Sequence, residues 1–124
     1  FDRNMNLMAQ YVYGLQYIVG VSGIASNSKY VFVAISGQKS SLFVHDAQTL
    51  SVVHEMDIPD AVQAVAATES HVILCSLKSE NRASEDGRTE IYKIANDPNS
   101  GFGLTLKKTA YWFVGDGKSL FPIA

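Results

Sequence analysis

Two short runs of sequence, Val31-Phe32-Val33-Ala34 and Val44-His45-Asp46-Ala47, each have a counterpart further along the chain. The first run aligns with Val72-Ile73-Leu74-Cys75, 41 residues later, and the second aligns with Ile91-Tyr92-Lys93-Ile94, 47 residues later. β-Branched and aromatic residues dominate these runs, and Gly, Ser, Asn, Asp or Pro bound them, which is the pattern of strands separated by turns. The chain is therefore predicted to contain one strand-rich unit twice.

The same pattern predicts strands along the whole chain. We expect them near 8–13, 17–25, 30–36, 41–46, 51–57, 62–67, 71–77, 89–94, 104–113 and 119–123. The Ala-rich segment 60–68 is the best helix candidate, but Val62 and Val65 favour an extended backbone. A repeat of about 40–45 residues is the length of a four-stranded propeller blade, which has to stack on neighbouring blades to bury its faces. The predicted fold class is all-β, with two consecutive four-stranded antiparallel blades that form part of a larger ring.

The predicted organisation is a single all-β unit over residues 1–124. Residues 1–17 are expected to end a preceding blade, 18–58 and 62–114 to form the two blades, and 119–124 to begin a following one. The displacement between the two units rises from 41 to 47 residues because the connections between strands are longer in the second unit. Loop 78–88 is equivalent to 36–40, and loop 95–103 is equivalent to 47–49.

Composition argues against a nucleic-acid-binding protein and against a membrane-spanning one. The 124 residues are 47% apolar and 18% charged, with a formal net charge of −2, so no basic stripe exists to neutralise nucleic-acid phosphates. No apolar run approaches the roughly 20 residues that span a bilayer. Cys75 is the only cysteine and no Asn-X-Ser/Thr sequon occurs, which favours an intracellular setting, cytoplasmic or nuclear.

The segment from Leu42 to Leu50 resembles the third strand and following turn of the WD-repeat family, in which an apolar pair precedes Trp-Asp and a Thr-Gly turn follows. His45 takes the Trp position, Asp46 retains the Asp, and Leu50 stands where Gly is usual; in the second unit Tyr92-Lys93 occupies the dipeptide. The resemblance implies a non-enzymatic scaffold for protein–protein interaction. Its expected partners are other proteins, together with the remaining blades or a partner chain that completes the fold.

In such propellers the loops that join second to third strands and fourth to first strands share one face. The residues expected to bind a partner on that face are Asp57, Asp60, Lys78, Glu80, Arg82, Glu85, Asp86, Arg88, Asp116 and Lys118. Mixed charge of this kind gives orientation and association rate in protein recognition. The alternative for 78–88 is a solvated loop tip in which Asp86-Gly87 makes the return turn of a hairpin.

The sequence predicts no catalytic residue, metal site or cofactor. Residues 115–119 end in Gly-Lys-Ser like a phosphate-binding loop, but Trp112 stands where that motif needs Gly, so a turn is expected. His45 and His54 could face each other across a hairpin, although structural hydrogen bonding is the alternative. Cys75 is expected to be a buried, inert thiol, because no basic neighbour is evident to stabilise a thiolate.

The aromatic run Tyr111-Trp112-Phe113, with Phe121, is consistent either with packing between blades or with a hot spot for a partner. A second hypothesis for the whole chain is a self-contained small all-β sandwich or barrel that binds a small ligand in its interior. A third is an enzymatic propeller whose catalytic residues lie in other blades.

Overall fold

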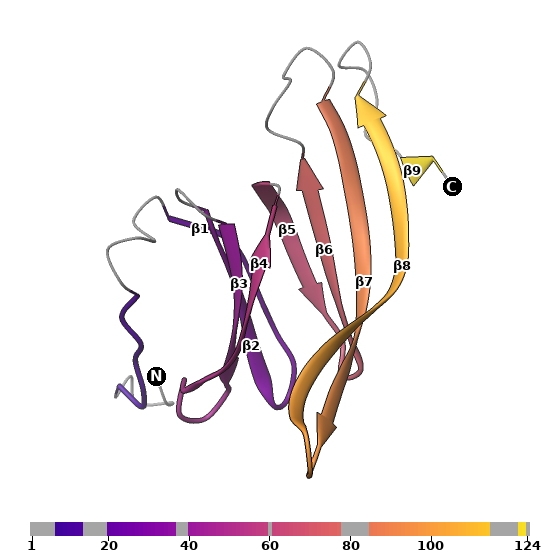
Figure 1. The fold of residues 1–124 in the computed structure, drawn as a ribbon. Coiled ribbons are helices and arrows are strands. Elements are labelled where there is room, and N and C mark those ends of the chain that lie inside the picture. Colours follow the sequence, from indigo (N-terminus) through magenta and orange to yellow (C-terminus); the bar gives the residue numbers. More distant parts are fainter. Residues whose placement is uncertain are drawn as a thin grey trace.

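The chain folds as two antiparallel meanders, in which each strand pairs with the next one along the sequence. The computed structural model describes residues 7–13, 20–36, 40–59, 61–77, 85–114 and 122–123, and these ranges contain no helix. The prediction of an all-β fold with two four-stranded antiparallel units is thus confirmed. Figure 1 shows the two sheets side by side.

The first sheet has the strand order β1-β2-β3-β4. Its strands are β1 (Gly20–Ser26), β2 (Tyr30–Ser36), β3 (Ser40–Asp46) and β4 (Val52–Ile58). The short polar links 27–29 and 47–51 close its hairpins at one end of the sheet. We call this end of the molecule the turn end, and the opposite end the loop end.

The second sheet has the order β5-β6-β7-β8-β9. Its strands are β5 (Ala61–Ala67), β6 (His71–Leu77), β7 (Glu85–Asp97), β8 (Gly101–Val114) and the two-residue β9 (Pro122–Ile123). The strand β9 pairs with Tyr111 and Trp112 of β8. The assignment of 119–124 to a following blade remains a prediction. In the structure, Pro122 and Ile123 pair with β8 of the second sheet.

The two sheets repeat one another in register as well as in order. Tyr30 pairs with Asp46 in the first sheet, and His71, 41 residues later, pairs with Lys93, 47 residues later. The register shifts recur at the same displacements, at Val21/Gly23 and Val62/Ala64 and then at Val44/His45 and Ile91/Tyr92. Because bulges bend a strand at a defined point, their repetition gives both sheets the same local geometry. The duplication seen in the sequence is a duplication of structure.

Each sheet has a core face, directed toward the other sheet, and an outer face. Alternation along the strands sends every second side chain to the core face. The buried residues that form this core are Tyr30, Phe32, Ala34, Leu42, Val44 and Ile58 from the first sheet, and Val62, Val72 and Leu74 from the second. Packing of apolar side chains between the sheets is the main source of stability, at about 25 cal/mol per Å² of apolar surface removed from water.

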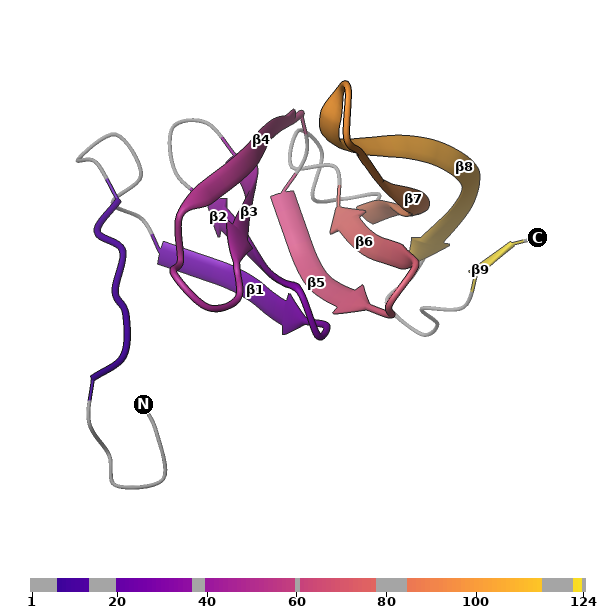
Figure 2. The same ribbon diagram turned by 90° about the horizontal axis from the view of Figure 1, so that it is seen from below.

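The first strands of the two sheets, β1 and β5, lie side by side near the centre of the molecule (Figure 2). A Cβ atom on Gly23 would lie 3.0 Å from the Val65 Cγ2 and 3.3 Å from the Val65 backbone nitrogen. No side chain fits between the strands at this point. Glycine therefore permits the close approach of β1 to β5.

Equivalent turns of the two units are tied together at the turn end. Asn27 Nδ2 donates a 3.0 Å hydrogen bond to the Thr68 carbonyl oxygen, and the Ser28 backbone N–H donates a 2.9 Å bond to Glu69 Oε1. The Ser28 hydroxyl donates to the second carboxylate oxygen of Glu69 at 2.5 Å. The carboxylate form of Glu69 is stabilised by these bonds, so its pKa lies below the ordinary value, with a smaller contribution from the Lys29 charge.

The prediction of a long loop at 95–103 is wrong. The strand β7 continues to Asp97 and β8 begins at Gly101, so only Pro98-Asn99-Ser100 form the turn. This extended hairpin curves toward the first sheet (Figure 1), where Asn96 Nδ2 donates a 2.8 Å bond to the Tyr30 hydroxyl. Phe102 packs edge-on against Tyr30 at 4.9 Å between ring centroids. These tertiary contacts stabilise strand structure in a segment rich in turn-forming residues.

The predicted strand at 8–13 is also not observed. Residues 7–13 carry no strand hydrogen bonding, and they lie on the side of the first sheet away from the second (Figure 1). Tyr13 packs against the outer face there, at 5.0 Å from the Phe43 ring. The segment covers part of the outer face without extending the sheet.

Candidate functional site

The residues predicted to bind a partner divide between described and undescribed parts of the chain. Asp60, Lys78, Glu80, Arg82, Asp116 and Lys118 lie outside the described residues. The other four lie toward the loop end, where β4 ends and β7 begins (Figure 1). The structure thus places Asp57, Glu85, Asp86 and Arg88 at a common end of the two sheets, although on different strands.

The stretch Glu85 to Arg88 was predicted to belong to a loop, and this is wrong. Its four residues begin β7 and pair with Tyr111, Trp112, Phe113 and Val114 of β8. Gly87 pairs with Trp112 inside the sheet, so Asp86-Gly87 is not the return turn of a hairpin. Pairing with a long neighbouring strand overrides the turn preference of Asp-Gly.

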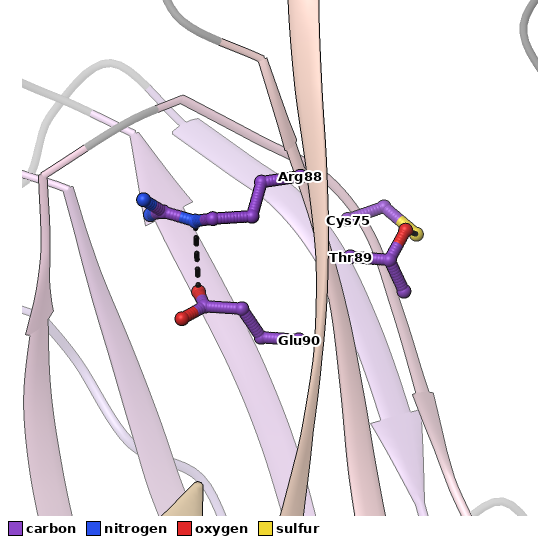
Figure 3. Close-up of polar contacts among 4 residues, drawn as sticks. All are labelled: Cys75, Arg88, Thr89 and Glu90. Carbon is purple, nitrogen blue, oxygen red and sulfur yellow. Dashed lines mark hydrogen bonds and ion pairs between the residues drawn. The ribbon is translucent and has the colours of Figure 1, made fainter. Parts of the chain in front are cut away.

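Arg88 points from β7 toward the first sheet (Figure 3). Its Nε lies 3.3 Å from Glu90 Oε1, and the two side chains are only 23% and 12% exposed. Burial raises the pKa of the neighbouring Tyr92 to about 12, and the Glu90 charge and a hydrogen bond with Glu90 add to the shift. Arg88, Glu90 and Tyr92 thus form a polar row on the core face of β7. Arg88 is a partly buried residue of this row and not a solvated loop residue.

Asp57 is exposed on the last strand of the first sheet, opposite Ser41. Glu55, two residues earlier, is also exposed and lies opposite Phe43. Cross-strand partners share a face, so both carboxylates lie on the outer face of the first sheet. Asp57 is thus a predicted partner-binding residue whose side chain is exposed.

His45 and Asp46, the dipeptide that carries the family resemblance, hold the turn between β3 and β4. His45 is 2% exposed, and its Nδ1–H donates a 2.9 Å bond to the Leu50 carbonyl oxygen. Its Nε2 is then the acceptor for the Tyr13 hydroxyl at 2.6 Å. Burial raises the pKa of Tyr13 to about 12, with a smaller contribution from Tyr11. His45 is therefore a structural residue with both ring nitrogens satisfied.

Asp46 completes the same turn through its carboxylate. Its Oδ1 accepts backbone N–H groups from Gln48 at 2.8 Å and from Thr49 at 3.0 Å. The Thr49 bond, followed by the Gln48 bond, holds the pKa of Asp46 below its ordinary value. Leu50 then adopts φ +59°, a left-handed conformation that glycine adopts most readily. A position where the family usually has glycine thus has the backbone geometry that favours glycine.

The sequence left open whether His45 and His54 face each other across the β3–β4 hairpin, and in the structure they do not. His54 pairs with Val44, whose side chain lies on the core face, whereas His45 lies on the outer face. His54 contacts Phe102 at 5.3 Å between ring centroids. The described residues contain no group of three or more His, Cys, Asp or Glu side chains that could hold a metal ion.

Cys75 lies on the outer face of the second sheet, on the opposite side of β7 from Arg88 and Glu90 (Figure 3). Its Sγ lies 3.5 Å from the Thr89 hydroxyl oxygen. The thiol is partly exposed, so the prediction of a buried cysteine is wrong.

The aromatic run at the end of β8 is described only in part. Tyr111 is 65% exposed, and the side chains of Trp112, Phe113 and Phe121 lie outside what the structure describes.

The described part of the molecule carries a polar pocket and an apolar pocket. A polar pocket of about 390 Å³ lies at the turn end and is lined by Ser28, Lys29, Tyr30, Asp46, Ala47, Gln48 and Asn96. An apolar pocket of about 220 Å³ lies on the outer face of the first sheet and is lined by Tyr11, Tyr13, Val21, Ile24, Val31, Val33, His45 and Leu50. Sequence reasoning missed both, because each combines residues from distant strands.

Comparisons with known proteins add no assignment to this geometry. Within the part of the chain that the structure describes, no helix is long and apolar enough to cross a membrane. The chain matches no protein-family model, and comparison with curated proteins and with solved structures gave no significant match.

Proposed function

We propose that the chain is a non-enzymatic scaffold for protein–protein interaction, built as two consecutive blades of a WD-like β-propeller. One observation carries the proposal: the two sheets repeat strand order, pairing register and bulge positions at fixed displacements. The close approach of β1 to β5 supports it, because the first strands of neighbouring blades lie innermost in a propeller.

The turn between β3 and β4 gives independent support. His45 and Asp46 occupy the family's dipeptide and hold the turn, and Leu50 adopts the left-handed conformation at the usual glycine position. These residues have structural roles, which suits a rigid platform. A catalytic use of His45 is disfavoured because both of its ring nitrogens are engaged and its side chain is 2% exposed.

In this proposal a partner protein binds at the loop end, with Asp57 among its contacts. The test is site-specific photocrosslinking: a benzophenone amino acid replaces Asp57 in one variant and Lys107, an exposed residue of β8, in the control. Incubation with extract should give discrete protein adducts at position 57 that excess unlabelled chain suppresses. Identical adducts at both positions, or none at position 57, would contradict a partner site at the loop end.

The polar pocket at the turn end favours a second candidate, the binding of a small polar ligand. The space between the core faces is filled by Phe32, Leu42 and Leu74, which are fully buried, so a ligand would bind at the edge of the sheets and not in the interior. The pocket combines the Lys29 ammonium, the Asp46 carboxylate and the Asn96 amide. Chemical-shift changes confined to these residues on titration with a small-molecule library would support this candidate, and their absence would exclude it.

A further inference from the structure

The polar pocket at the turn end lies where three hairpins of the two sheets meet. The first sheet contributes residues 28–30 from the β1–β2 hairpin and 46–48 from the β3–β4 hairpin, and the second sheet contributes Asn96 from the β7–β8 hairpin. The volume of about 390 Å³ is within the range of small-molecule sites, which is roughly 300–1,000 Å³. A small molecule in this pocket would contact both sheets.

Hydrogen bonds hold the walls of the pocket in place. Asn27 Oδ1 accepts the backbone N–H groups of Lys29 at 2.9 Å and of Tyr30 at 2.8 Å. The Ala47 N–H donates a 2.9 Å bond to the Lys29 carbonyl oxygen, which joins the two turns of the first sheet. Asn96 Nδ2 donates to the Tyr30 hydroxyl at 2.8 Å and so fixes the wall from the second sheet. A ligand therefore meets a preformed site, which lowers the entropic cost of binding.

Lys29 and Asp46 bring opposite charges to the pocket without neutralising each other. The structure shows no ion pair between these two residues in the part of the chain that it describes. Hydrogen bonds from Thr49 and then Gln48 hold the pKa of Asp46 below its ordinary value, so its carboxylate is charged at neutral pH. The Lys29 side chain is exposed and that of Asp46 is half-buried. The pocket thus offers one ammonium group and one carboxylate group to a ligand.

Uncharged hydrogen-bonding groups in the pocket also retain capacity for a ligand. The bonds that Asp46 accepts from Gln48 and Thr49 all go to Oδ1, so Oδ2 can accept from a ligand. Tyr30 is only 7% exposed, and its hydroxyl accepts the Asn96 bond and keeps its own hydrogen to donate. The pocket therefore has both a donor and an acceptor beyond its two charged groups.

We propose that this pocket binds a small zwitterion, such as an amino acid, whose carboxylate pairs with Lys29 and whose ammonium group pairs with Asp46. A ligand with only a carboxylate would be attracted by Lys29 and repelled by Asp46, and a ligand with only an ammonium group would meet the opposite conflict. A zwitterion satisfies both charges. Such a ligand belongs to the polar class of the second candidate function, on which this inference rests, and the partner site at the loop end is not involved.

The first experiment compares matched probes on the isotopically labelled chain by nuclear magnetic resonance. The zwitterions are ω-amino acids from glycine to aminohexanoate, which span a range of charge separations, and butyrate and butylamine carry a single charge. All are titrated at the same ionic strength, because salt screens exposed charges. The backbone amide signals of Lys29, Gln48 and Asn96 should shift saturably with a zwitterion, with an affinity at least tenfold higher than for butyrate or butylamine.

The outcomes separate this inference from the candidate function on which it rests. Binding of butyrate, of butylamine or of an uncharged polar compound as tightly as every zwitterion would overturn the zwitterion assignment and leave the pocket a site for other polar ligands. Saturable shifts that fall only outside the pocket would also overturn it. If neither these probes nor the small-molecule library binds, both the inference and the candidate function fail.

The second experiment separates recognition of charge from a structural effect. Lys29→Met keeps the length of the side chain and removes its charge, so the preference for the zwitterion over butylamine should disappear. Asp46→Asn retains an oxygen for the N–H groups of Gln48 and Thr49, so the turn is kept and the preference over butyrate should disappear. An equal loss of affinity for every probe would indicate damage to the turn and would overturn the assignment.

Two matched controls accompany these variants. Lys108→Met removes the charge of an exposed lysine on β8. Asp97→Asn changes a carboxylate that accepts the Asn99 N–H at 2.7 Å, at the tip of the β7–β8 hairpin. Neither residue lines the pocket, so both controls should keep the affinities and preferences of the parent. Loss of the preference over butylamine in Lys108→Met, or over butyrate in Asp97→Asn, would contradict recognition by Lys29 and Asp46.

Discussion

The contact between β1 and β5 can be tested by adding a single methyl group. Gly23→Ala would place a Cβ atom 3.0 Å from Val65 Cγ2, 3.3 Å from the Val65 nitrogen and 3.6 Å from the Ala64 carbonyl carbon. The valine methyl can rotate away, but the backbone nitrogen cannot, so the two strands have to separate by a few tenths of an ångström. Overpacking of this kind costs about 1–3 kcal/mol in the free energy of unfolding.

Gly103→Ala is the matched control for this change. A Cβ atom on Gly103 of β8 would meet nothing within 4 Å. Alanine at such a position restricts the unfolded chain and stabilises the protein by about 0.4–1 kcal/mol. The two Gly→Ala variants should therefore differ by about 1.5 kcal/mol or more, with opposite signs relative to the parent.

The assay is urea denaturation followed by circular dichroism, at one protein concentration for all three proteins. The midpoint should fall for Gly23→Ala and rise for Gly103→Ala, with similar slopes. Equal stability of the two variants would refute the close packing of β1 on β5, and with it the stacking of the sheets through their first strands.

Three further predictions concern the contacts that hold the turn end and the outer face. Phe102→Ala removes the ring that packs on Tyr30 and His54 and should lower the free energy of unfolding by about 2 kcal/mol; an unchanged urea midpoint would contradict the role of the extended hairpin. Tyr13→Phe removes the 2.6 Å bond to His45 and should cost about 1–2 kcal/mol, whereas Tyr111→Phe, at an exposed ring, should cost nothing measurable. Asp46 has a lowered pKa, so its charged form stabilises the fold above the unfolded-state pKa of about 3.9, and this contribution is lost as pH falls through the folded-state pKa. The stability difference between the parent and Asp46→Ala, measured by denaturation from pH 7 to pH 2, should therefore shrink in acid, and a constant difference would refute the assignment.

The sequence predicted the strands best where apolar residues run without interruption between turn residues. The predicted ranges 30–36 and 71–77 match β2 and β6, because a short continuous apolar run is typical of a buried strand. The displacements of 41 and 47 residues also match the observed pairing of Tyr30 with Asp46 and of His71 with Lys93. Local pattern was sufficient for these elements.

The errors arise where tertiary contacts override local preference. Asn96, Asp97, Gly101 and Gly103 are typical turn residues, yet the β7–β8 hairpin extends through them because Asn96 and Phe102 bind Tyr30. Arg88 was placed in a loop because it ends a charged run, but β7 begins at Glu85 and Arg88 lies beside Glu90. The contact between Tyr13 and His45 joins residues 32 positions apart, and no sequence pattern indicated it.

From the sequence, the partner-binding residues could be predicted only as charged residues in loops that share one face. Six of the ten lie outside the described residues, and the structure places Asp57 on a strand next to Glu55. Charge along a sequence indicates exposure in general terms, but whether a side chain faces solvent or a neighbouring sheet depends on strand register. This is why Asp57 is exposed whereas Arg88 is partly buried.

The central claim is that one blade-like unit occurs twice and that the two copies stack through their core faces. A map of nuclear Overhauser contacts from the isotopically labelled chain tests it most directly. The account predicts two sets of cross-strand contacts related by the observed displacements, such as Tyr30–Asp46 and His71–Lys93, together with inter-sheet contacts between Gly23 and Val65. Cross-strand contacts that join β1 to β8 in a closed barrel, with none between Gly23 and Val65, would contradict it.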